Sequence, residues 1–174
     1  MSSDSAEFYQ LKGLIQSENW SQALEILEQP SALAMGGEQA NGLLAHAVSM
    51  RGGEAIVDAL IAVGAGVNSR SMSGETMIES ALLAIAGTSR PSTPLLKLLL
   101  SGADANAPLS TGFRPLHFVA SRGDVRLVHL LKSYGADPYL DSVDPDPIDP
   151  FMAARLSGRE DEVIEALHAE PRQA

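Results

Sequence analysis

The feature that most constrains the fold is a short glycine-containing motif that occurs three times. Each copy follows an apolar run of helical spacing, and the copies lie at Val63–Asn68, Ser101–Asn106 and Tyr134–Tyr139. Their glycines at 64, 102 and 135 are separated by 38 and 33 residues. A period of roughly 20–50 residues is typical of repeat architectures, in which each unit packs on its neighbours. We therefore expect a stack of similar units.

The segment Gly112–Asp137 shows what one unit contains. Pro115 can open a first helix, because its missing N–H has no partner there in any case. Gly123 permits the left-handed turn that ends this helix, and Gly135 ends a second helix. Apolar residues lie at helical spacing along the two helices: Leu116, Val119, Ala120, Leu127, Leu130 and Leu131. Neither helix is long enough to be stable alone in water, so stacking must supply the stability.

Gly112–Asp137 resembles the ankyrin repeat consensus at most of its fixed positions, with Arg114 in place of the usual Thr and Asp124 in place of the usual His. The resemblance covers residues 41–168 well and 7–30 weakly. It implies an all-α ankyrin repeat solenoid of about five stacked helix pairs with short hairpin loops. The Ala- and Gly-rich composition suggests a bacterial source.

The same resemblance predicts how the repeats divide the chain, which we expect to form a single domain over residues 1–174. We expect an N-terminal capping helix pair, three repeats and a C-terminal capping repeat. Their ranges are 7–30, 41–69, 70–107, 108–140 and 141–170. The repeat at 70–107 carries about five extra residues, which we place at 87–94, in the turn between its two helices.

Charge and composition exclude several classes of partner and site. The chain has a net charge of −10, which disfavours nucleic acid and anionic membranes and favours a neutral or basic protein. It has no cysteine, so disulfides, zinc–thiolate sites and a cysteine nucleophile are excluded. No secretory signal or membrane-spanning stretch is visible, which predicts a cytoplasmic protein.

No catalytic, cofactor or metal-binding motif is visible. For His117, and for His46 at the equivalent place, the resemblance implies a structural role, with hydrogen bonds to the backbone near the turns. His129 and His168 have no partner at a spacing that suggests chemistry. Five aspartates lie within 137–149, but prolines stiffen this segment and the glycine of a calcium-binding loop is absent. We expect an acidic, extended hairpin, no cofactor and no metal.

The resemblance implies that the hairpin tips and the C-terminal ends of the first helices line a concave surface that binds partners. The positions that match in this chain are Met50, Arg51, Met72, Ser73, Glu75, Leu83, Ser110, Thr111, Phe113, Ser121, Arg122, Asp144, Asp146, Ile148 and Leu156. Phe113, Met72 and Arg122 are of the types that anchor interfaces. The alternative is that Phe113 and Met72 pack between neighbouring hairpins.

The function that we expect is a non-catalytic protein–protein interaction module acting through this concave face. The alternative is an inhibitor or immunity-type protein that neutralises a toxin or an enzyme by masking a basic active site. An enzyme with an improvised site at the acidic hairpin and His117, a nucleic-acid binder, and self-association through the ends of the stack remain as further, less favoured classes.

Overall fold

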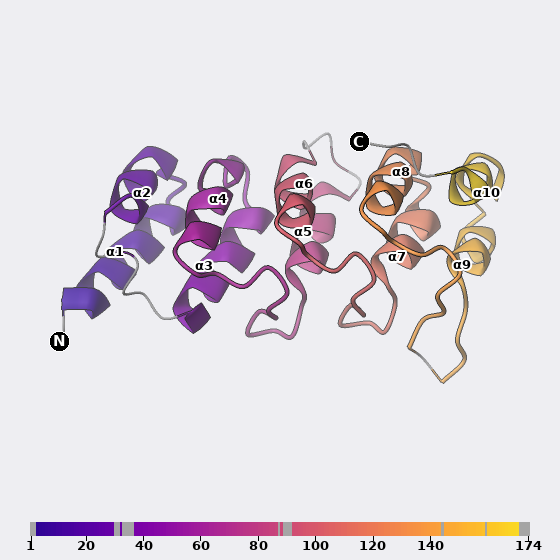
Figure 1. Ribbon diagram of the computed structural model, residues 1–174, viewed down its shortest axis with the longest axis horizontal. Helices are drawn as coiled ribbons and strands as arrows, with labels where there is room; N and C mark the ends of the chain where they lie inside the picture. The colour runs from indigo at the N-terminus through magenta and orange to yellow at the C-terminus, as the bar shows by residue number, and fades with distance from the viewer. Residues whose placement is uncertain are drawn as a thin grey trace. The chain divides into compact units, whose positions relative to one another are not determined.

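The computed structural model describes residues 3–29, 32, 37–86, 88, 92–143, 145–158 and 160–170 (Figure 1). Within these residues the chain forms ten α-helices and no β-strand beyond one isolated bridge, between Arg70 and Thr76. The predicted all-α architecture of five helix pairs is confirmed. The chain divides into two compact units, residues 1–103 and 104–174.

The first unit contains three helix pairs. The first helices of the pairs are α1 (Ser3–Gln16), α3 (Gly37–Ser49) and α5 (Met77–Ile85), and the second helices are α2 (Trp20–Leu27), α4 (Glu54–Ala62) and α6 (Thr93–Leu100). Helix α3 packs against α1 and α5, and α4 packs against α2 and α6. The first helices thus form one layer and the second helices another (Figure 1).

Apolar residues at helical spacing fill the space between these layers. The side chains that are fully buried include Leu11, Ile15, Leu44, Ile56, Leu60, Met77, Leu82, Leu95 and Leu98. In the first pair, Leu27 is buried, whereas Trp20, Leu24 and Ile26 are half-buried. Burial of this apolar surface, about 25 cal/mol per Å², is the main force that holds the pairs together.

Polar groups fix the ends of the helices in the first unit. The Thr76 hydroxyl accepts a hydrogen bond from the backbone N–H of Glu79 at 3.1 Å and so caps α5. Lys97 on α6 donates to the carbonyl oxygen of Glu54 at 2.7 Å and pairs with Asp58 on α4 at 2.6 Å. Of the positions 87–94, where the extra residues were expected, 87 and 89–91 lie outside the described residues, and 93 and 94 already belong to α6.

The second unit contains α7 (Pro115–Arg122), α8 (Val125–Ser133), α9 (Pro150–Leu156) and α10 (Glu160–His168). Pro115 opens α7 as predicted, and Gly123 ends it with a φ of 76°, in the left-handed region. Carboxylates of Asp124 and Asp149 cap α8 and α9 by accepting from backbone N–H groups. Leu116, Leu131 and Leu167 are fully buried, whereas Leu130 is half-buried.

Hydrogen bonds from hairpin asparagines link successive repeats within each unit. In the first unit, the Asn68 side chain donates to the carbonyl oxygen of Gly102 at 3.0 Å. In the second, Asn106 donates to the carbonyl oxygen of Gly135 and accepts from the N–H of Asp137, both at 2.8 Å. The asparagine that ends each of the first two glycine motifs therefore satisfies backbone groups in the next motif along the chain.

Candidate functional site

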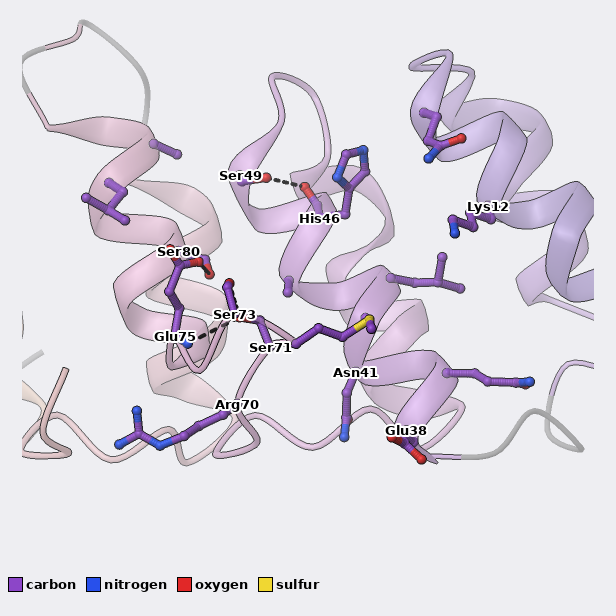
Figure 2. A pocket seen from close by; sticks show the side chains of 18 of the residues that line it. Lys12, Glu38, Asn41, His46, Ser49, Arg70, Ser71, Ser73, Glu75 and Ser80 are labelled. Atoms are coloured by element: carbon purple, nitrogen blue, oxygen red, sulfur yellow. Dashed lines mark hydrogen bonds between the residues drawn. The ribbon is translucent and has the colours of Figure 1, made fainter. Parts of the chain in front are cut away.

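A groove of about 950 Å³ lies in the first unit. Three first helices and the hairpin 70–76 form its walls (Figure 2). The side chains and backbone that line it belong to Phe8, Lys12, Gln16, Glu38, Gln39, Asn41, Gly42, Leu43, Ala45, His46, Ser49, Arg70, Ser71, Met72, Ser73, Glu75, Ser80, Leu83 and Ala84.

The hairpin wall is held by its own hydrogen bonds. The N–H of Ser71 donates to the carbonyl oxygen of Glu75 at 2.8 Å, and the N–H of Glu75 donates back to the Ser71 hydroxyl at 3.2 Å. Gly74 has a φ of 84°, which lets the turn close. The Arg70 guanidinium donates to the carbonyl oxygen of Gly74 at 2.7 Å. The turn is therefore set before any partner arrives.

Two large apolar side chains of the groove face water. Met72, at the hairpin tip, is fully exposed, and Leu83 on α5 is 48% exposed. Exposed single apolar residues are common on protein surfaces, but a cluster within a concavity marks an interaction site. The alternative reading of Met72, that it packs between hairpins, is wrong, because its side chain has no burial at all.

The charged side chains of the groove are mixed in sign. Lys12 comes from α1, Glu38 from α3, and Arg70 and Glu75 from the hairpin. The Glu75 side chain is half-buried, and its Oε2 atom accepts a hydrogen bond from the Ser80 hydroxyl at 3.4 Å. Figure 2 shows Glu75 beside Ser80, with Lys12 on the opposite wall. The groove is thus suited to a polar and apolar surface rather than to a purely apolar ligand.

His46 does not have the backbone-bonding role expected for it. Helix α3 already begins at Gly37, so His46 lies in its last turn rather than in its first, too far from the turn that precedes the helix. Its Nε2 atom is buried and has no hydrogen-bond partner in the described part of the chain. The backbone carbonyl of His46 accepts from the Ser49 hydroxyl at 2.8 Å (Figure 2).

His117, in the second unit, has the predicted structural role. Its Nδ1 atom accepts from the backbone N–H of Arg114 at 3.3 Å, and its Nε2 atom lies 2.7 Å from the carbonyl oxygen of Ile148. Because Nδ1 accepts a hydrogen bond, the proton of the neutral ring is on Nε2, which donates a hydrogen bond to the carbonyl oxygen of Ile148. The ring is fully buried, and this burial lowers the pKa of His117, an effect that Arg114 reinforces and that the Ile148 bond opposes.

The second unit holds the remaining predicted contact residues in separate surroundings. Ser110 and Thr111 are exposed at a hairpin tip. The Phe113 ring is half-buried and stacks on His117 with 5.6 Å between centroids, which favours the packing alternative for this residue. Arg122 is exposed, and its guanidinium lies over the Phe118 ring at 4.3 Å from the centroid.

The other predicted residues are placed as follows. The Ser121 hydroxyl donates to the carbonyl oxygen of Phe118 at 3.0 Å. Asp146 and Leu156 are exposed, and Ile148 is half-buried. Asp144 lies outside the described residues. In the first unit, Met50 is half-buried and Arg51 is exposed, and neither lines the groove. The structure brings Met72, Ser73, Glu75 and Leu83 together and leaves Met50 and Arg51 apart from them.

Two of the aspartates within 137–149 accept hydrogen bonds from backbone N–H groups. Asp137 accepts from the N–H of Tyr139 at 2.9 Å, and Asp149 accepts from the N–H of Met152 at 2.7 Å. Asp141 and Asp146 are exposed. Among the described residues, no three His, Asp or Glu side chains lie close enough together to hold a metal ion.

Sequence reasoning missed the groove residues on α1 and along α3. Phe8, Lys12, Glu38 and Asn41 carry no hairpin motif, and the predicted surface used only hairpin tips and helix ends. Asn41 has a structural role as well, since its side-chain oxygen accepts from the N–H of Gly66 at 2.6 Å. The available signal was the helical pattern before Leu43, which extends α3 toward Gly37.

None of the helices described here combines the length and the apolar composition that crossing a membrane requires.

Comparisons with known proteins identify the repeat. Residues 82–131 match the family model for ankyrin repeats that occur in many copies. The chain is 36% identical over 89 residues to the nuclear factor NF-kappa-B p105 subunit of Gallus gallus, and 39% identical over 93 residues to that of Mus musculus. Each of these matches covers 49% of this chain and 8% of the relative.

A third relative is a probable serine/threonine-protein kinase of Dictyostelium discoideum, 29% identical over 104 residues. That match covers 59% of this chain and 12% of the relative. The chain thus corresponds to a small part of each of these proteins.

Proposed function

The chain is an ankyrin repeat protein, and from that premise we propose that it is a non-catalytic module that binds a partner protein in the groove of its first unit. Ankyrin repeats are protein–protein interaction modules. The observation that carries the proposal is the exposure of Met72 and Leu83 within one concavity. Burying this exposed apolar surface against a partner stabilises a complex by roughly 25 cal/mol for each Å² removed from water.

The rigidity of the groove supports the same proposal. The hairpin 70–76 is closed by its own hydrogen bonds, and α5 begins directly after it with the Thr76 cap. A surface that is already ordered loses little conformational entropy when it binds. The groove can therefore hold a partner without first being rearranged.

The experiment compares three tagged forms of the full chain as baits in extracts of the native cells at low salt. Leu83→Lys places a positive charge in the groove, and Leu100→Lys is the matched control, because Leu100 is 66% exposed on α6 and does not line the groove. We expect a stoichiometric partner that the wild type and Leu100→Lys retain and that Leu83→Lys loses. Equal retention by all three baits would contradict the proposal.

A second candidate function is favoured by the exposed carboxylates of Asp141 and Asp146 and by the net charge of −10. In this alternative the protein is an inhibitor or immunity-type protein that masks the basic active site of a toxin or an enzyme. Electrostatic attraction of this kind is screened over about 8–10 Å near physiological salt. Affinity that falls steeply as salt is added would support the inhibitor, and affinity that is insensitive to salt would exclude it.

A further inference from the structure

The position of Glu75 in the groove points to the chemistry of the partner. This inference rests on the proposed function and makes it more specific. We propose that the partner protein inserts a lysine or arginine side chain, with its charged end at the Glu75 carboxylate and its aliphatic stem among the apolar side chains of the groove.

Glu75 is held in place by backbone hydrogen bonds. Its carbonyl oxygen accepts from the N–H of Ser71, and its own N–H donates to the Ser71 hydroxyl. The next residue, Thr76, is the N-cap of α5. The backbone of Glu75 is therefore held by the hairpin on one side and by the start of α5 on the other. The carboxylate can face the groove without a change of fold.

The Glu75 carboxylate has no cationic partner in the described part of the chain. Its Oε2 atom accepts from the Ser80 hydroxyl at 3.4 Å, and among the described residues no lysine, arginine or histidine is paired with it. The nearest cation along the chain, Arg70, uses its guanidinium to hold the hairpin turn. A half-buried carboxylate that lacks a counter-charge attracts one from a partner, because partial burial strengthens the interaction.

Apolar surface lies beside this carboxylate in the groove. Met72 and Leu83 line the same groove as Glu75 and face water. Lysine and arginine combine an apolar stem with a charged end, so one side chain of either type can cover apolar surface and still reach a carboxylate. Methionine adapts readily to such a stem, because it is unbranched and flexible. A purely apolar or an acidic segment would leave Glu75 unpaired.

The test selects binders from a displayed library of random peptides of about a dozen residues against the full chain. Selections run in parallel on the wild type, on Glu75→Gln, on Leu83→Lys and on Glu25→Gln. Glu75→Gln keeps the size of the side chain, and circular dichroism checks the fold. Glu25 is the matched control, since it is an exposed carboxylate on α2 outside the groove.

We expect peptides selected on the wild type to be enriched in lysine or arginine next to apolar residues. Glu75→Gln should weaken the best synthetic peptide by about tenfold, and so should replacement of its lysine by norleucine or of its arginine by citrulline. The two changes together should weaken binding no more than either alone. Glu25→Gln should bind as the wild type does.

Two results would overturn the proposal, and only one of them would also contradict the proposed function. If peptides lose affinity with Leu83→Lys but not with Glu75→Gln, the groove binds partners without a basic side chain, and the proposed function stands. If no selected peptide depends on Leu83, the groove is not the binding surface, and the proposed function is contradicted as well.

Discussion

The Nζ atom of Lys132 lies 3.0 Å from the carbonyl oxygen of Ala166, so a buried ammonium group occupies the C-terminal end of α10. It also donates to the carbonyl oxygens of Leu167 and Ala169. The last carbonyls of a helix have no partners within the helix, and a cation there is stabilising. In the preceding repeats, the residue three positions before the motif glycine is apolar, Leu99 or Ile61.

Replacement of Lys132 by methionine should therefore loosen α10. The three carbonyl groups lose a charged donor, and we expect the free energy of unfolding to fall by about 1–3 kcal/mol. Hydrogen exchange should show faster exchange of the α10 amides. Arg126→Met on the same helix is the control, because its side chain is 85% exposed and its ion pair with Asp124, at 3.7 Å, adds little. Equal effects of the two variants would contradict this role of Lys132.

The burial of His117 should make the stability of the second unit depend on pH. Burial lowers its pKa below the ordinary value of 6.5, so the unfolded chain binds a proton at pH values where the folded chain does not. Stability is then fully present above pH 6.5 and is lost as the pH falls through the pKa of the folded state. Denaturant titrations between about pH 7.5 and 5 measure the loss.

His117→Gln should be less stable at neutral pH and should reduce the pH dependence of stability between pH 6.5 and 5. His129→Gln, which keeps the His117 ring, is the control and should retain it. If His117→Gln keeps the full pH dependence of the wild type, another group is responsible for it.

The asparagine bridge between repeats should contribute to the stability of the second unit. Asn106→Ala removes a donor to Gly135 and an acceptor for Asp137, and should cost about 1–2 kcal/mol. Thr111→Ala, at the tip of the same hairpin, should cost less than about 0.5 kcal/mol, because this side chain is exposed. Thermal or denaturant unfolding measures both. A cost for Asn106→Ala as small as that for Thr111→Ala would show that packing alone couples the repeats.

Much of the fold could be predicted, because glycine and proline act locally. Gly123 and Pro115 bound α7 where their backbone geometry requires it. The early start of α3 at Gly37 could not be predicted in the same way, since no cap residue or proline marks it, and His46 was misassigned for that reason. Propensity alone does not fix a helix start that packing with α1 and α5 decides.

The candidate site was predictable only in part. The hairpin residues Met72, Ser73 and Glu75 followed from the repeat pattern, but Lys12 and Glu38 come from helices that the pattern does not describe. The burial of Lys132 was not predicted, because a lysine within an apolar stripe of a helix normally extends its ammonium group into water. Its burial depends on the carbonyls of α10, which lie 34 residues or more along the chain.

Hydrogen exchange on the complex with the captured partner tests whether the groove of the first unit binds that partner. If it does, amide exchange should be slower in the hairpin 70–76 and in α3 and α5, and unchanged in α2, α4 and α6. Protection confined to α2, α4 and α6, or to the second unit, would contradict it.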